Sequence, residues 1–448
     1  MPSIFETDAA LDTLAATAIS QTKELMAQSE KLRDRREKAS RKRVARLFKD
    51  PKAIEATITL TDEVMRISSV QSSSRIFRRA AKKASLVGFG AVNALGLHFI
   101  GVLSRVVPGP IVGVVHQRVR ALSKDLILAS ESEKLAKHLA KRATKGISLN
   151  INVLGEAVLG DHEAEQRFQS ILEMMRRPEV NYISVKLSSI VAQLIIIDVD
   201  GSIDRVSEKM RILYRQAQEH GVFVNLDMEE YRDLPMTVAA FMRVLDEDEF
   251  AAMKAGIVLQ AYLPESHHFF GELVKWAKAR YEKSGGTIKV RLVKGANLAM
   301  ERAEAELHGW SAAPYRTKSD VDASYVRLVD AALRPEHAKA VRIGIASHNL
   351  FHMTWAIEVA KSRGVLEQID IEMLEGMANA EALAVTRAGQ PVLLYAPVTR
   401  KDDFAAAVAY LVRRLDENTS DENYLKAAFE ISKNPAKFKE QEERFLKS

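Results

Sequence analysis

The sequence predicts an α/β protein: a (β/α)8, TIM-like barrel preceded by an all-helical N-terminal arm domain. Two patterns carry this prediction. Eight short apolar runs alternate with amphipathic helical stretches from about residue 148 onward, which is the element order of a parallel barrel. A polar residue follows nearly every apolar run, where barrels of this kind place their chemistry. A doubly wound open sheet shares the alternation and is the competing fold.

Length and charge divide the chain. Its 448 residues exceed one ordinary domain but suit a barrel with an added segment. We expect a helical arm over residues 1–147, the barrel over 148–430 and a C-terminal tail over 431–448. Residues 1–150 hold 27 Lys and Arg against 14 Asp and Glu, and the remainder holds 38 against 45. A basic arm can contact nucleic acid or anionic lipid, but its bases are interleaved with acids. A solvated helical arm is therefore favoured, and no nucleic-acid partner is expected.

The arm is predicted to be helical because apolar residues recur at helical spacing from Leu11 onward. A charged helix covers Lys31–Lys49 and ends at Asp50-Pro51, and further helices are expected at Ile54–Ile67 and Ala121–Lys145.

The segment Ser85–Ser104 is apolar apart from Asn93, His98 and its terminal serines, and it approaches the ~20 residues that span a bilayer. A buried or surface-lying helical hairpin is favoured over a membrane span. The chain does not start with a signal peptide, and it contains no cysteine, which fits a reducing compartment. We expect a cytoplasmic protein, with peripheral attachment to the inner face of a membrane left open.

The barrel prediction rests on eight apolar runs taken as strands: Leu149–Val153, Tyr182–Leu187, Phe223–Leu226, Gly256–Tyr262, Ile288–Val293, Arg342–Ala346, Ile369–Leu374 and Val392–Tyr395. Amphipathic stretches between them are taken as helices: Glu163–Arg176, Ile203–His220, Met236–Leu245, His267–Lys283, Ala323–Leu333, Thr354–Arg363 and Ala380–Ala388.

Polar residues at the strand ends are the candidate site. In chain order they are Glu156, Lys186, Asp227, Gln260, Arg291 with Lys294, His348 with Asn349, Glu372 with Glu375, and Tyr395. Consecutive Arg413 and Arg414 follow in the next predicted helix, and Glu417 lies one turn after Arg413, close enough to pair with it.

These residue types suggest a small anionic substrate. Adjacent arginines suit a carboxylate, although surface salt bridges explain the pair equally well. Lys186 suits a Schiff base or a carboxylate, or else a buried pair with an acid such as Asp227. Arg291 and Lys294 beside Gly295 suit phosphate or the electron-rich end of a flavin.

Several classes are excluded or disfavoured. The lack of cysteine removes disulfides, iron–sulfur clusters and thiol nucleophiles. No phosphate-binding Gly-x4-Gly-Lys loop or Gly-x-Ser-x-Gly elbow occurs. His348 and His352 have metal-like spacing but no evident third ligand, so no metal is expected. Two enzyme classes remain, a lysine-dependent aldolase and a flavin or phosphate-cofactor barrel, beside a non-enzymatic binding module.

Eight ordered segments resemble the proline dehydrogenase domain of the proline utilization A family, from about Val115 to Phe429. They are Ser184–Ser188, Asn225–Glu230, Val258–Tyr262, Arg291–Ala296, Ser347–Asn349, Leu374–Met377, Tyr395–Val398 and Tyr410–Leu415. The resemblance implies a distorted (β/α)8 barrel that binds FAD and oxidises L-proline to Δ1-pyrroline-5-carboxylate by hydride transfer to flavin N5. Electrons would pass to a membrane quinone.

The resemblance also implies roles for individual residues. Lys186, Arg413 and Arg414 would hold the proline carboxylate, Asp227 and Tyr395 would shape the pocket, and Leu292 would pack on the ring. Glu156 would pair with Arg413 and close the site. The flavin would be bound by Asp227, Met228, Gln260, Arg291, Val293, Lys294, Gly295, Ala296, Ser347, His348, Asn349 and Glu417.

The chain departs from the family in two places. Asn297-Leu298 stands where many members have an aromatic pair, and no aldehyde dehydrogenase domain with its cysteine follows. We therefore expect only the first reaction of proline catabolism, with an aldehyde dehydrogenase as a candidate partner. Oligomeric state, the quinone, a preference for proline over hydroxyproline and the role of the basic arm stay open. It also stays open whether the chain is a standalone enzyme or a truncated part of a longer bifunctional protein.

Overall fold

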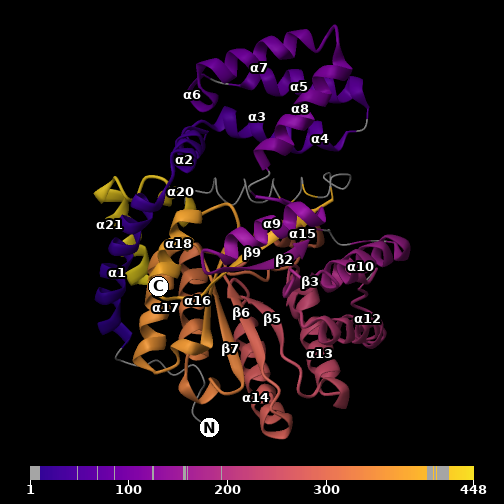
Figure 1. The fold of residues 1–448 in the computed structure, drawn as a ribbon, viewed down its shortest axis with the longest axis vertical. Helices are drawn as coiled ribbons and strands as arrows, with labels where there is room; N and C mark the ends of the chain where they lie inside the picture. Colours follow the sequence, from indigo (N-terminus) through magenta and orange to yellow (C-terminus); the bar gives the residue numbers. More distant parts are fainter. Residues whose placement is uncertain are drawn as a thin grey trace.

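The computed structural model describes residues 11–47, 49–67, 69–84, 86–123, 126–154, 158, 160–192, 194–400, 407, 410 and 423–448. A barrel of parallel strands is wrapped by helices, and a bundle of N-terminal helices lies at one end of it (Figure 1).

Eight parallel strands close into a barrel, which confirms the predicted fold class. They are β2 (Ile147–Val153), β3 (Tyr182–Lys186), β4 (Phe223–Asp227), β5 (Ala255–Gln260), β6 (Ile288–Val293), β7 (Val341–Ala346), β8 (Ile369–Leu374) and β9 (Val392–Thr399). Each strand pairs with the next, and β9 closes the ring by pairing with both β8 and β2. Each predicted apolar run coincides with one of these strands.

An additional short strand joins the barrel from the N-terminal part. Strand β1 (Leu128–Ala129) pairs in parallel with Val398 and Thr399, the end of β9 beyond its pairing with β8. The single helix predicted over Ala121–Lys145 is therefore wrong: this stretch holds the end of α8 (Pro108–Ser123), strand β1 and helix α9 (Ser132–Ala143). Strand β9 extends beyond β8, so the backbone N–H and C=O groups on that edge of β9 are available to pair with β1.

Helices cover the outside of the barrel. Those predicted between the strands are α10 (Asp161–Met175), α12 (Val199–His220), α13 (Leu234–Leu245), α14 (Ser266–Ser284), α16 (Lys318–Ala332), α17 (Leu350–Ser362) and α18 (Asn379–Arg387). The structure adds α11 (Leu187–Ile190), α15 (Leu298–His308) and the 3-10 turns Tyr231–Asp233, Asp248–Phe250, Pro335–His337 and Leu366–Gln368. Side chains of Asp198 and Thr317 cap α12 and α16.

Strand β6 shows how the barrel separates its two faces. Side chains alternate along a strand, so Lys289 and Arg291 reach the barrel interior, where Lys289 Nζ lies 2.9 Å from Asp370 and 2.7 Å from Glu372. The intervening Val290 is fully buried in the hydrophobic core between barrel and helices. The interior is therefore polar at this level, which is where the site is built.

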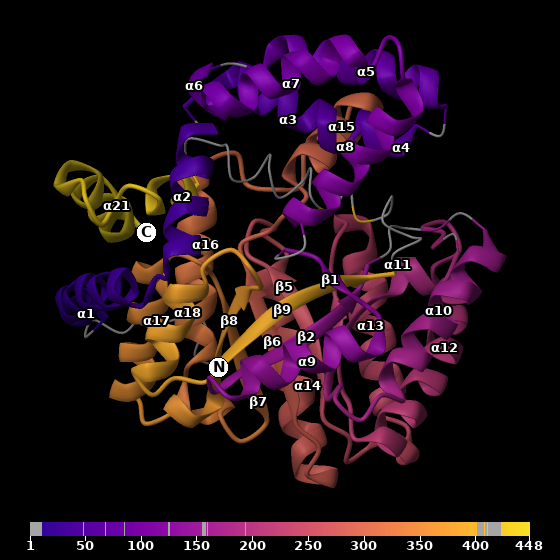
Figure 2. The same cartoon turned by 45° about the horizontal axis from the view of Figure 1, so that its top comes forward.

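The N-terminal helices form two groups (Figure 2). Helix α1 (Leu11–Leu32) packs along α17 and α18 on the barrel, with the Thr22 and Thr354 hydroxyls 2.9 Å apart; α2 (Arg35–Leu47) follows it. The remaining helices make a separate bundle around Val64, Phe77 and Ala81: α3 (Pro51–Thr61), α4 (Glu63–Arg66), α5 (Val70–Lys83), α6 (Leu86–Phe89), α7 (Ala91–Leu103) and α8.

The apolar segment Ser85–Ser104 is broken at Gly90, whose φ of 78° separates α6 from α7. Across the described part of the chain, no helix has both the length and the apolar character needed to cross a membrane. At the other terminus, α20 (Tyr424–Ala428) and α21 (Pro435–Lys447) fold against the barrel, with the Phe445 ring 5.7 Å from that of Phe351.

Candidate active site

The candidate site is a cavity of about 1250 Å³, open to solvent, at the carboxyl ends of the barrel strands. Most of the site residues expected from the sequence line it: Lys186, Asp227, Met228, Gln260, Arg291, Val293, Lys294, Gly295, Ala296, Ser347, His348 and Tyr395. Strands far apart in sequence deliver these side chains to one place because all parallel strands of a barrel end at the same rim.

A buried ion pair forms the floor of the cavity. The Arg291 guanidinium pairs with the Asp227 carboxylate and lies 3.6 Å from Glu372. The Tyr395 hydroxyl donates to Asp227 Oδ2 at 2.7 Å, and the Arg291 guanidinium lies 5.1 Å from the Tyr395 ring centre. Burial alone would lower the pKa of Arg291, but the charges of Asp227 and Glu372 raise it above its ordinary value. Burial and the neighbouring Asp227 raise the pKa of Tyr395 well above 10.

Lys186 forms an ion pair with an acidic residue other than the expected Asp227. Its ammonium donates to Glu229 Oε2 at 2.6 Å, whereas Asp227, the acid considered from the sequence, pairs with Arg291. Both members of the Lys186–Glu229 pair line the cavity and are partly exposed. An anionic ligand entering here would compete with Glu229 for the Lys186 ammonium.

Lys294 belongs to a second charged cluster behind the cavity wall. It pairs with Asp322 on α16, which also binds Lys318, and lies 3.0 Å from His352 Nδ1 on α17. Burial, followed by repulsion from Lys318, lowers the pKa of Lys294 to about 7 despite the pull of Asp322. Burial and the charge of Lys294 hold the pKa of His352 well below 6.5. None of these helical partners is evident from the sequence.

Gly295 has a conformation and a neighbour that require glycine. Its φ is 123°, and a Cβ at this position would lie 2.4 Å from the Tyr262 ring. In the lining of the same cavity, the buried amide oxygen of Gln260 accepts no hydrogen bond from the described residues. Bare backbone and an available acceptor are features of a ligand-binding wall.

Two expected site residues lie elsewhere. Leu292 is fully buried in the hydrophobic core and does not line the cavity, because strand alternation directs Arg291 and Val293 inward and Leu292 outward. Leu374, at the end of β8, does line the cavity. Asn349 does not line the cavity either; its side chain caps α17 by accepting from the Phe351 N–H at 3.0 Å.

Other lining residues were not anticipated as site residues: Asn152, Leu154, Glu229, Val258, Asn297, Ala346, Met373, Leu374 and Tyr410. Most occupy the inward positions of strands or the residues just beyond, so strict period-2 counting would have found them. Glu156, Arg413, Arg414 and Glu417 lie outside the described residues. Glu375, at a strand end, pairs with Arg142 of α9 and lies 3.3 Å from His138.

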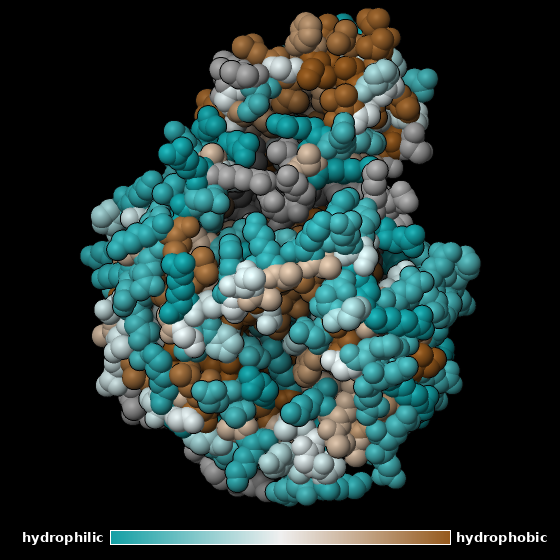
Figure 3. Space-filling view, viewed as in Figure 1, coloured by the Kyte–Doolittle hydropathy of each residue, from teal (hydrophilic) through white to brown (hydrophobic). Residues whose placement is uncertain are grey.

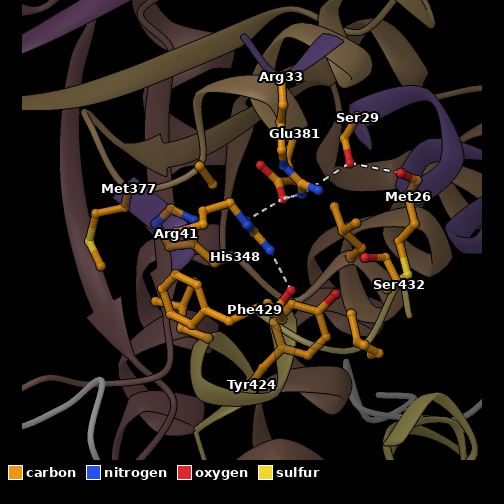
Figure 4. Close-up of a pocket in the computed structure, with 15 residues that line it drawn as sticks. Met26, Ser29, Arg33, Arg41, His348, Met377, Glu381, Tyr424, Phe429 and Ser432 are labelled. Atoms are coloured by element: carbon orange, nitrogen blue, oxygen red, sulfur yellow. Dashed lines mark hydrogen bonds and ion pairs between the residues drawn. The ribbon is translucent and has the colours of Figure 1, made fainter. Parts of the chain in front are cut away.

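A smaller cavity of about 430 Å³ lies where the arm meets the barrel (Figure 4). Arg33 and Arg41, from the arm, both pair with Glu381 of α18, and Arg41 also donates to the Ala428 carbonyl at 2.5 Å. His348 lines both cavities, and its Nε2 accepts from the Leu374 N–H at 3.1 Å. Ion pairs therefore anchor the arm at a cavity that shares His348 with the candidate site.

Comparisons with known proteins agree on a single family. The family model described as proline dehydrogenase matches residues 135–427. A solved structure of proline utilization A (PutA) from Corynebacterium freiburgense is 50% identical and covers 70% of this chain and 33% of that chain, with a TM-score of 0.64. PutA from Bdellovibrio bacteriovorus, solved after inactivation by N-propargylglycine, is 26% identical and covers 95% of this chain and 44% of that chain, with a TM-score of 0.78.

The bifunctional curated relatives are longer than this chain. The bifunctional protein PutA of Klebsiella aerogenes is 23% identical over 329 residues, which are 69% of this chain and 24% of that protein. The chain therefore spans about a quarter of the length of the first curated relatives it matches.

Proposed function

Since the chain belongs to the proline dehydrogenase family, we propose that it oxidises L-proline to Δ1-pyrroline-5-carboxylate, the first step of proline catabolism to glutamate, with FAD as cofactor. The observation that carries this proposal is the cavity itself. It joins a partly exposed lysine, Lys186, to the buried Asp227–Arg291–Tyr395 network at one end of a closed barrel.

The residues present fit a flavin. Residues of all eight barrel strands line the cavity, so a large cofactor and a small substrate would contact different parts of its wall. Gly295 lets a ring system approach bare backbone, the Gln260 amide oxygen can accept from a ring N–H, and Lys294 supplies a cation. Apolar Met228, Val258, Val293 and Leu374 supply packing surface. When bound, FAD would supply the two-electron acceptor that takes a hydride, at N5, from the ring carbon next to the proline nitrogen.

The chain's own residues would bind and orient proline. Lys186 would exchange Glu229 for the substrate carboxylate, together with Arg413 and Arg414 as the family resemblance implies. Fixing the carboxylate fixes the ring, which is catalysis by positioning. Asp227 is already committed to Arg291 and Tyr395, so it is a wall of the pocket and not a free general base. Proline would react as the free amine and release its N–H proton to solvent.

Quinone is the proposed electron acceptor. A separate or fused aldehyde dehydrogenase is the proposed consumer of the product, in keeping with the bifunctional relatives. Glu156 is proposed as the gate that pairs with Arg413, and Glu417 as a flavin contact.

The decisive experiment is anaerobic absorbance of the FAD-loaded protein before and after L-proline. We expect bleaching with L-proline and none with D-proline. Arg413→Met and Arg414→Met should each raise the KM for proline at least tenfold, because each removes a charge-assisted bond to the carboxylate. Arg205→Met is the matched control, because Arg205 is an exposed residue of the outer helix α12 that pairs with Asp198. The KM of this variant for proline should equal that of the unchanged protein.

N-propargylglycine gives an independent readout. Loss of activity with a stoichiometric mass increase, prevented by excess L-proline, would support a proline site next to the flavin. A flavin that stays oxidised with L-proline and with hydroxyproline would overturn the proposed reaction.

An aldolase is the second candidate, because one observation favours it: the pKa of Lys294 is about 7, low enough for an amine nucleophile. The ion pair of Lys294 with Asp322 argues against it, since that amine is already engaged by a carboxylate. Borohydride trapping of a substrate adduct on Lys294 or Lys186 would support the aldolase, and unmodified lysines would reject it.

A further inference from the structure

The bundle of N-terminal helices presents an apolar surface that the proposed reaction does not use. Helix α7 runs along the end of the molecule farthest from the barrel (Figure 1). Its outward side chains are exposed although large and apolar: Leu95 is 64% exposed, Phe99 69%, Val102 64% and, just past the helix end, Val106 78%. Figure 3 shows a brown, hydrophobic cap over this end of the molecule.

These residues form one stripe. Their spacing of four, three and four residues keeps them on one side of a helix. The opposite side of α7 is apolar too, because Leu97 and Ile100 pack on the bundle core of Phe77 and Ala81. Only Asn93 and His98 are polar in α7, and a helix that is apolar on nearly all sides is normally covered by protein or by lipid. The described residues cover only the inner side of α7.

The charge of the bundle indicates what covers the outer side. From Val64 to Lys124 the chain contains ten Lys and Arg and no Asp or Glu. Arg75, Arg79, Lys82, Arg105 and Arg118 are exposed. A second copy of the bundle would bring the same charge and be repelled, whereas an anionic bilayer surface offers both apolar acyl chains and negative headgroups.

Helix length decides how the bundle would meet a bilayer. Helix α7 has 13 residues, about 20 Å at ~1.5 Å per residue, against a hydrocarbon core of roughly 30 Å. It can therefore lie in the interface but not cross it. We propose that α7 is a membrane-docking helix: Leu95, Phe99, Val102 and Val106 enter the headgroup–acyl boundary of an anionic bilayer, and the surrounding cations contact its headgroups.

Docking in this way would place the bundle between the bilayer and the barrel. Figures 1 and 2 both draw α15, which begins just past the carboxyl end of β6, on the side of the barrel nearest the bundle. The carboxyl-end rim of the barrel would therefore face the bilayer across the bundle. The binding itself rests on the surface alone and not on the proposed reaction.

The test is co-sedimentation of the full chain with phosphatidylcholine vesicles that contain 50% or no phosphatidylglycerol, without proline. We expect binding to the anionic vesicles, at least tenfold weaker binding to the neutral ones, and release as sodium chloride rises from about 0.05 to 0.5 M, because salt screens the headgroup charge. Phe99→Ser with Val102→Ser should weaken binding at least tenfold. Both positions are exposed, so folding should be retained.

The matched control is Ile196→Ser with Ile197→Ser, a pair of exposed isoleucines, 55% and 99% exposed, on the loop after β3. It should bind like the unchanged protein. In Phe99→Trp, tryptophan emission should shift to the blue on anionic vesicles. Equal binding by the α7 variant and the unchanged protein would overturn the proposal. So would a dimer in size-exclusion chromatography that the α7 variant abolishes, combined with no vesicle binding. Since no substrate is present, a failure of proline oxidation leaves this result intact, and the reverse also holds.

Discussion

Replacing Asp227 by Asn tests the electrostatic centre of the site. In the native protein the Asp227 carboxylate accepts from Arg291, from the Tyr395 hydroxyl at 2.7 Å and from the Asn225 amide at 3.3 Å. Asn removes the charge but little volume, so Arg291 is left in a buried position with Glu372, 3.6 Å away, as its remaining acid. Glu372 also neutralises Lys289.

Breaking a buried ion pair by removing one member costs about 3–5 kcal/mol. At roughly 2 °C per kcal/mol for a large domain, the unfolding midpoint should fall by about 6–10 °C. Tyr395→Phe removes one hydrogen bond to a charged acceptor, worth about 1.5–3 kcal/mol, and should lower the midpoint by roughly 3–6 °C. The double variant should lose less than the sum, since Tyr395 has less to stabilise once the carboxylate is gone.

The assay is scanning calorimetry at pH 7.5 with FAD in constant excess, because cofactor binding raises the midpoint by mass action. Tyr214→Phe is the control: this tyrosine is fully buried, and its hydroxyl has no hydrogen-bond partner among the described residues. Its midpoint should change by less than about 1 °C, since no hydrogen bond is lost. An Asp227→Asn midpoint as little changed as that of Tyr214→Phe, or strict additivity in the double variant, would refute the coupled network.

Three further predictions concern stability and charge. Gly295→Ala should destabilise the protein by about 3 kcal/mol or more through clash and an unfavourable φ, while Gly309→Ala, with positive φ but open space, should cost only about 1 kcal/mol; equal losses in urea titrations would contradict this. Burial and nearby Glu230 raise the pKa of Asp233 to about 7, so its stabilising contribution is present below about pH 4 and is lost as the pH rises to about 7. Asp233→Asn should therefore raise the melting midpoint by several degrees at pH 8 and not at pH 4.5, and a gain of the same size at both values would exclude this origin. Lys318→Gln removes a repelling charge and should move the pH at which Lys294 becomes reactive to acetic anhydride upward from about 7; mass spectrometry across pH 6–10 measures it, and an unmoved or lowered midpoint would count against the Lys318–Lys294 repulsion.

The order of elements predicts the barrel from sequence and leaves a doubly wound open sheet as its competitor. Short apolar runs separated by amphipathic helices have few folds available, because parallel strands need long crossovers and burial on both faces. The sequence also determined most of the cavity lining, since Lys186, Asp227, Arg291 and Tyr395 stand at strand ends and strand ends of a barrel converge. Leu292 faces the hydrophobic core, because alternation cannot direct Arg291 and its neighbour to the same face.

Only the tertiary structure decided which charges meet. Lys186 pairs with Glu229 and Lys294 with Asp322, partners 43 and 28 residues away. Strand β1 was likewise hidden, because a two-residue strand exists only when the long edge of β9 is there to receive it. The local sequence carries the periodicity that decides which face of a strand or helix a side chain lies on. The pairing of buried charges depends instead on distances between elements, and these distances are established only when the barrel has closed.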